Sequence, residues 1–98
     1  MVSNEMRGEA VLTIRECWPE GGQAVIDECN KVTRFEGTCK DFLSHCIACG
    51  GNWGAMLLTG IKELWPNVYE AIPDDMGPFA FTCLCKVLNL CGVDTSEK

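Results

Sequence analysis

The residues of this chain best suited to chemistry lie in the segment 45–51, which reads HCIACGG. Two cysteines separated by two residues, Cys46 and Cys49, can direct both sulfur atoms at one ion, and the glycines that follow let the chain turn. Such a pair is half of a structural zinc site, which is closed by four ligands. We predict a structural zinc ion here, bound by the pair and by two further residues from the set His45, Cys85 and Cys91.

The eight cysteines of this 98-residue chain also allow an interpretation without metal. So many would suit a secreted disulfide scaffold, but residues 1–9 carry acids where a secretion signal needs a basic end and an apolar run. We therefore expect a cytoplasmic protein whose thiols stay reduced. In the metal-free interpretation every thiol is buried or idle, and packing is the default expectation for Cys17, Cys29, Cys39, Cys83 and Cys91.

Other kinds of cysteine and histidine chemistry fit the pattern poorly. A thiol redox role for Cys46 and Cys49 ranks third, because the pair falls at the C-terminal end of a predicted helix, where the helix dipole opposes a thiolate. His45 is the only histidine, and adjacent helical residues point about 100° apart, so it makes a poor dyad with Cys46. Phosphate-binding glycine loops and nucleophile elbows are missing from the sequence. We predict no catalytic or cofactor-binding residues and expect that the protein is not an enzyme.

The charge of the chain favours a protein partner. Fourteen acidic and eight basic residues give a net charge of −6, which repels phosphate backbones and anionic lipid. We expect neither direct nucleic-acid binding nor membrane binding, since no apolar run approaches the roughly 20 residues that span a bilayer. A partner with a basic surface would suit the charge. The acids that we predict to contact it are Glu16, Glu20, Asp27, Glu28, Glu70, Asp74 and Asp75.

The elements that must position these residues are all helical. Apolar residues recur at helical spacing, and strand-like alternation of useful length is missing. Caps, prolines and glycines predict helices over residues 4–17, 19–32, 39–49, 53–65, 66–72 and 78–91. We expect one compact all-α domain, a bundle of five to six short helices covering residues 1–98, with a frayed tail at about 94–98.

An internal echo adds a detail to this expectation. Residues 13–19 read TIRECWP and residues 60–66 read GIKELWP. In both, a helix pattern ends in a Trp-Pro step that opens another helix. The echo predicts a duplicated helical hairpin folded on itself, and chance similarity over seven positions is the alternative.

These observations favour a binding module. We predict a small acidic helical protein that inhibits or regulates a partner by occupying its surface, such as a surface that binds nucleic acid. Small phage or mobile-element proteins that block host defence, anti-CRISPR proteins among them, work in this style. The alternative is a self-associating structural subunit without metal, in which Trp53, Phe79 and Phe81 form a dimer patch.

Overall fold

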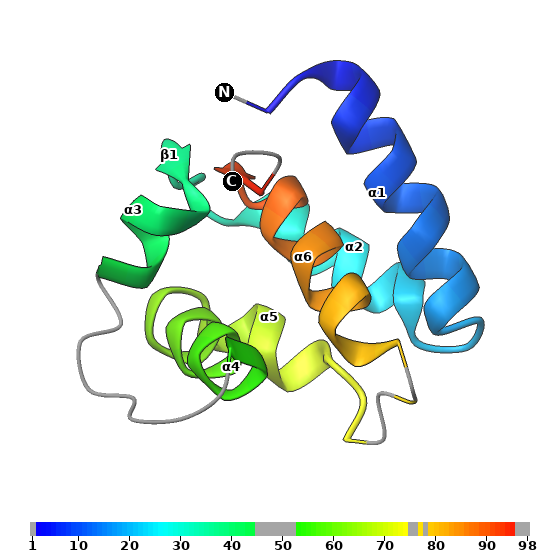
Figure 1. The fold of residues 1–98 in the computed structure, drawn as a ribbon. Coiled ribbons are helices and arrows are strands. Elements are labelled where there is room, and N and C mark those ends of the chain that lie inside the picture. The colour runs from blue at the N-terminus through cyan, green and yellow to red at the C-terminus, as the bar shows by residue number, and fades with distance from the viewer. Residues whose placement is uncertain (1, 45–52, 75–76, 78, 96–98) are drawn as a thin grey trace.

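Six helices and one pair of very short strands make up the part of the chain that the structure describes (Figure 1). The computed structural model describes residues 2–44, 53–74, 77 and 79–95. In chain order the elements are α1 (Asn4–Cys17), α2 (Gly22–Lys31), β1 (Gly37–Thr38), α3 (Cys39–Ser44), α4 (Trp53–Leu64), α5 (Pro66–Ala71), α6 (Ala80–Leu90) and β2 (Val93–Asp94). This architecture confirms the prediction of an all-α bundle of short helices.

Helix starts follow the capping chemistry of the sequence. The Ser3 hydroxyl accepts a hydrogen bond from the Met6 backbone N–H at 3.1 Å, which caps α1. At α3 the Thr38 hydroxyl accepts from the Asp41 N–H at 3.2 Å, and the Asp41 carboxylate accepts from the Thr38 N–H at 3.0 Å. This reciprocal pair is the predicted capping box, and it satisfies donors that the helix itself leaves unbonded.

The two Trp-Pro corners have nearly the same local geometry. Trp18 has φ −133° and ψ 79°, and Trp65 has φ −137° and ψ 72°. The backbone N–H of Trp18 donates to the Ile14 carbonyl at 3.0 Å, and that of Trp65 donates to the Ile61 carbonyl at 2.7 Å. Both indoles are buried, each 5% exposed. The sequence echo therefore corresponds to a repeated corner. The helices that follow differ in length, since α2 has 10 residues and α5 has 6.

Helix α6 runs through the middle of the hydrophobic core and packs chiefly against α1 (Figure 1). Six of its eleven residues are buried: Cys83, Leu84, Val87, Leu88, Asn89 and Leu90. The buried polar side chain of Asn89 accepts a hydrogen bond from the Thr95 hydroxyl at 2.9 Å, so its burial is compensated. Around α6 the other helices contribute further buried residues: Ala10, Ile14, Trp18, Val25, Ile26, Cys29, Phe42, Leu57, Ile61, Trp65, Val68 and Ile72.

The structure corrects three details of the predicted elements. Helix α2 begins at Gly22 and not at Pro19, because residues 19–21 form a turn and Gly21 and Gly22 have little tendency to form a helix. Two strands also appear, where none was expected: β1 and β2 pair in parallel, with Gly37 opposite Val93. As part of β2, Asp94 is held in this pairing, so the tail does not fray there.

A matched pair of glycine substitutions tests the packing of α1 against α2. A Cβ added at Gly22 would lie 2.7 Å from the Ile14 carbonyl oxygen, whereas one added at Gly8 would meet nothing within 4 Å. We expect Gly22→Ala to lower the free energy of unfolding by about 1–3 kcal/mol. We expect Gly8→Ala, inside α1, to raise it by up to about 1 kcal/mol. Urea denaturation measures both, and equal stability of the two variants would contradict this account of the corner.

Candidate functional site

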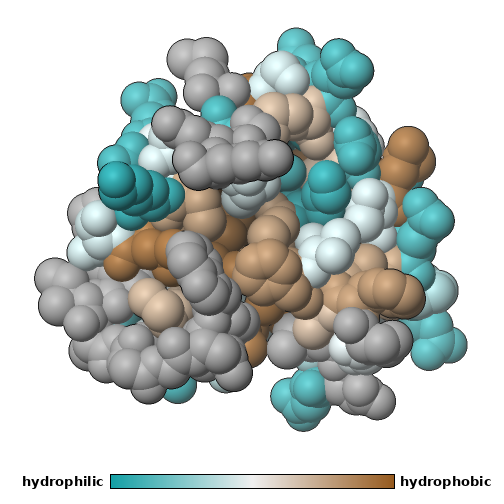
Figure 2. All heavy atoms as spheres, viewed as in Figure 1, coloured by the Kyte–Doolittle hydropathy of each residue, from teal (hydrophilic) through white to brown (hydrophobic). Residues whose placement is uncertain are grey.

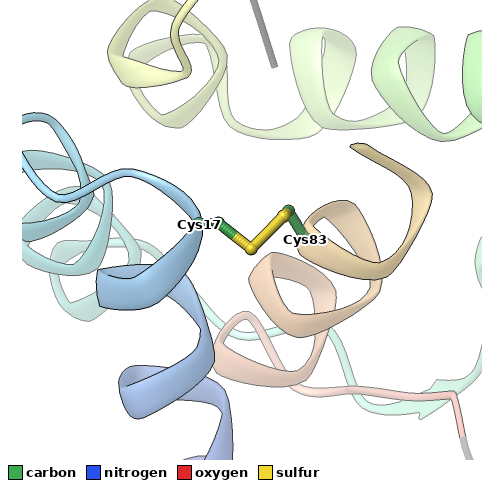
Figure 3. The surroundings of a disulfide bond; sticks show 2 residues. All are labelled: Cys17 and Cys83. Atoms are coloured by element: carbon green, nitrogen blue, oxygen red, sulfur yellow. A yellow bond between two sulfur atoms is a disulfide. The ribbon is translucent and has the colours of Figure 1, made fainter. Parts of the chain in front are cut away.

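A disulfide joins Cys17 at the end of α1 to Cys83 in α6, with their Cα atoms 6.4 Å apart (Figure 3). This finding corrects two expectations: the thiols are not all reduced, and these two cysteines do more than pack. Both sulfurs lie on the apolar faces where α1 and α6 meet, which is why the pattern suggested packing alone. Reduced thiols were the expected consequence of a cytoplasmic location, and the disulfide does not agree with that consequence.

The described part of the structure does not bring the residues predicted to bind zinc together. His45, Cys46 and Cys49 lie outside the described residues. Cys85, in α6, is half-buried, and Cys91, just after α6, is fully buried. Among residues 2–44, 53–74, 77 and 79–95, no group of three or more His, Cys, Asp or Glu side chains is placed to hold a metal ion. The zinc site at Cys46 and Cys49 stays a prediction.

Each of the two visible candidates has a different thiol beside it. Cys91 shares a side-chain hydrogen bond with Cys29 of α2, and this bond, followed by burial, raises the pKa of the Cys91 thiol. Burial raises the pKa of Cys85, and the neighbouring Cys39 adds to that rise. Burial also raises the pKa of Cys39. All three groups are therefore held as neutral thiols at neutral pH, the opposite of what a reactive thiolate needs.

Two hollows meet at Pro73, where the loop after α5 touches the corner between α1 and α2. One hollow is lined by Cys17, Trp18, Pro19, Glu20, Gly21 and Pro73. The other is lined by Leu58, Tyr69, Glu70, Ile72, Pro73 and Asp74. A Cβ added at Gly21 would lie 3.5 Å from Pro73 Cγ, so the loop and the corner are in close contact.

Three exposed carboxylates, Glu20, Glu70 and Asp74, surround these hollows, and we call them the acidic rim. Among the described residues, no side chain forms a hydrogen bond or ion pair with any of the three. The lining of the hollow beside Trp18 is largely apolar, and that of the hollow beside Tyr69 is mixed. The indole N–H of buried Trp18 also has no hydrogen-bond partner among the described residues. A partner that supplies cations would complement the carboxylates of this surface.

The other acids predicted to contact a partner are placed differently. Glu28 forms an ion pair with Lys31 at 3.3 Å, within α2. Asp27 accepts a hydrogen bond at 2.9 Å from Gln23, which in turn accepts from Arg15. Glu16 is exposed on α1 and lines neither hollow, and Asp75 lies outside the described residues.

Exposed apolar residues occur elsewhere on the surface. Phe79 is 70% exposed and Phe81 is 50% exposed, both at the start of α6, whereas the Trp53 side chain lies outside what the structure describes. Figure 2 shows hydrophobic residues reaching the surface across the middle of one face, with hydrophilic residues along its upper and right-hand edges. An apolar surface of this kind is a common feature of protein contact sites.

Sequence reasoning missed the residues that shape the hollows and one basic site. Pro73 ends the helix predicted over residues 66–72, and its contact with the α1–α2 corner depends on tertiary packing, which local sequence does not indicate. Arg7 and Arg34 line a separate hollow beside β1. Arg7 donates to the Leu90 carbonyl at 2.8 Å, and burial, with Arg34 nearby, lowers its pKa. Arg7 and Arg34 lie far apart in the sequence, so no local pattern predicts that they line the same hollow.

Comparisons with known proteins add no relative: no family model, no curated protein and no solved structure matches the chain. The described helices are also too short or too polar to cross a lipid bilayer.

Proposed function

We propose that this protein is a small binding module that occupies a basic surface of a partner protein, and that it carries out no reaction of its own. The observation that supports this proposal most directly is the acidic rim, where Glu20, Glu70 and Asp74 surround two partly apolar hollows and pair with no other described residue. Carboxylates that no described residue engages can receive a cation from another molecule. The apolar lining supplies contact area that charge alone does not.

A basic residue beside one of the hollows, Lys62, is already engaged. The Lys62 ammonium lies 5.4 Å from the centre of the Tyr69 ring, in a cation–π contact at the edge of one hollow. Its charge lies on the ring face and not against a carboxylate. The three carboxylates of the rim would steer a basic surface toward the hollows. Inhibition of a nucleic-acid-binding partner, in the style of phage anti-defence and anti-CRISPR proteins, is the form of this function that we propose.

Charge reversal at the rim tests the proposal. The variant Glu20→Lys/Glu70→Lys/Asp74→Lys is expected to lose partner proteins that the unmodified chain captures from a lysate, with affinity falling about tenfold or more. The matched control is Glu5→Lys/Glu36→Lys/Glu63→Lys, which makes the same change in net charge at exposed acids that line neither hollow. We expect the control to retain the same partners, and added salt to weaken their binding.

Two results would contradict the proposal. One is capture that is unchanged in the rim variant, and the other is binding to an acidic partner that does not respond to salt. Capture lost equally from both triple variants would indicate a general effect of net charge and would also count against a specific rim.

Self-association is the second candidate function, and the exposure of Phe79 and Phe81 favours it. In that case the chain is a structural subunit, and zinc at Cys46 and Cys49 or the disulfide serves only to hold the fold. Sedimentation of the purified protein distinguishes the two: a stable dimer that becomes a monomer on Phe79→Ser/Phe81→Ser supports the subunit, and a strict monomer removes it.

A further inference from the structure

The hollow beside β1 brings together two arginines that lie far apart in the sequence. It has a volume of about 330 Å³, which is in the range of sites for small ligands. Arg7 of α1 and Arg34 of the segment between α2 and β1 line it, together with Val2, Phe35 and Glu36. Neither arginine forms an ion pair with a carboxylate of the described residues. The hollow therefore holds two positive charges that are open to an anion from outside.

Gly92, which also lines the hollow, lets Arg34 reach this place. It has φ +96°, and a Cβ at this position would collide with the Phe35 carbonyl oxygen and lie 3.1 Å from the Arg34 Cβ. The Phe35 N–H also donates to the Cys91 carbonyl at 2.8 Å. The segment that carries Arg34 is therefore held directly against the end of α6.

The guanidinium group of Arg7 is held at the same end of α6. It donates to the Leu90 carbonyl at 2.8 Å and to the Asn30 side-chain oxygen at 3.4 Å. A guanidinium has five N–H donors, so three of those of Arg7 have no partner among the described residues. Because the two bonds already fix the side chain, a ligand that used the remaining donors would not have to order it.

The charges in the lining favour an anion that carries a single charge. Both arginines stay protonated at neutral pH, and burial, followed by the charge of Arg34, lowers the pKa of Arg7. An anion between the two guanidinium groups would replace their repulsion by attraction to both. Exposed Glu36 stands in the same lining, so two positive charges and one negative charge leave a net charge of +1. That balance suits one negative charge better than two.

Among singly charged anions, a carboxylate fits this hollow best. Its two oxygens offer about four acceptor positions, enough for donors from both arginines. A phosphodiester also carries one charge, but the net charge of −6 of the chain repels the nucleic acids and anionic lipids in which such groups occur. Val2 and Phe35 add apolar surface to the lining, and the carbon atoms attached to a carboxylate can pack there.

We propose that the hollow formed by Arg7, Arg34 and Phe35 binds a small organic monocarboxylate, with its carboxylate between the two guanidinium groups and its apolar part against Phe35. A free carboxylic acid and the C-terminal carboxylate of a peptide share this chemistry. The site is lined by none of the residues of the acidic rim, so the inference does not rest on the proposed function.

Titration of the 15N-labelled 98-residue chain with 3-phenylpropionate, followed by NMR, tests the proposal. We expect saturable shifts of the Gly37 and Gly92 amide signals and a dissociation constant on the order of millimolar, as is usual for a ligand of this size. The uncharged 3-phenylpropionamide should bind at least about tenfold more weakly. Shifts that do not saturate, or an amide that binds as tightly as the acid, would overturn the proposal. Tighter binding of phenyl phosphate, which carries up to two charges, would do the same.

A pair of arginine variants assigns the binding to the hollow. Arg34→Gln is expected to lower the affinity for 3-phenylpropionate about tenfold or more, and it should fold normally because Arg34 is exposed. The matched control is Arg15→Gln, which removes the same charge from α1 outside the hollow and should keep the affinity. An affinity that is unchanged in Arg34→Gln, or reduced equally in both variants, would contradict the proposal.

Two peptides distinguish the possible sources of the carboxylate. They are N-acetyl-alanyl-phenylalanine with a free C-terminus and the same peptide with a C-terminal amide. If the free peptide binds more tightly than 3-phenylpropionate, the site takes the C-terminus of a peptide. If it binds no more tightly, the site takes a free acid. An amidated peptide that binds as tightly as the free one would count against recognition of a carboxylate.

Discussion

Replacing Cys17 and Cys83 together by alanine is expected to lower the free energy of unfolding by about 4 kcal/mol under oxidising conditions. The bridge joins residues separated by 66 positions, so it restricts a large part of the unfolded chain (Figure 3). Removing it returns that conformational freedom to the unfolded state. Urea denaturation followed by circular dichroism measures the loss.

The control for this prediction is the same double variant in a reducing buffer. In that buffer the unmodified chain also lacks the bridge, so the substitution changes only side-chain packing. It is expected to lower the free energy of unfolding by about 1 kcal/mol. The difference between the two buffers isolates the contribution of the bridge. An equal cost in both buffers would show that the bridge does not stabilise the fold.

Phe42→Ala is expected to lower the free energy of unfolding by about 3–5 kcal/mol. Phe42 is fully buried between two other rings: Trp65 stacks on it with ring centres 5.7 Å apart, and Phe35 meets it edge-on at 5.9 Å. The Trp65 indole N–H donates to the Thr33 carbonyl at 3.1 Å, which fixes the position of the ring that stacks on Phe42. Truncation therefore leaves a cavity that its surroundings cannot easily close.

A variant that keeps most of the volume serves as the control. Phe42→Leu is expected to lower the free energy of unfolding by about 1.5 kcal/mol, because the leucine side chain fills most of the space but loses the ring contacts. Tryptophan fluorescence in the folded state should change in both variants, since Trp65 loses its stacking partner. If the alanine and leucine variants are equally stable, the stacked cluster does not hold α3 to the rest of the fold.

The helices were largely predictable because their signals are local. The Thr38–Asp41 box, the apolar stripe of α6 and the two Trp-Pro corners each depend on residues a few positions apart. The parallel pairing of β1 with β2 was not predictable. Each strand has two residues, too few for any alternation, and their partnership depends on how the segment before α3 meets the segment after α6.

The disulfide and the acidic rim were harder to predict for a related reason. Cys17 and Cys83 occupy apolar stripes, where a cysteine packs equally well as a thiol or as half of a bridge, and only the docking of α1 on α6 decides which. The acids were expected to act by charge alone. Which of them cluster was set by the contact between Pro73 and the α1–α2 corner, so Glu20 joined Glu70 and Asp74, while Glu28 paired with Lys31.

The pairing of α1 with α6 has a consequence for how the protein is made. Helix α1 leaves the ribosome well before α6, which is the helix that it packs against most extensively. Until residues 80–94 leave the ribosome, the nascent chain exposes the side of α1 that packs against α6, together with the unbonded Cys17 thiol. The core around α1 and α6 can therefore form only after α6 has emerged, and in the meantime a chaperone or another unfinished chain has access to the same surface.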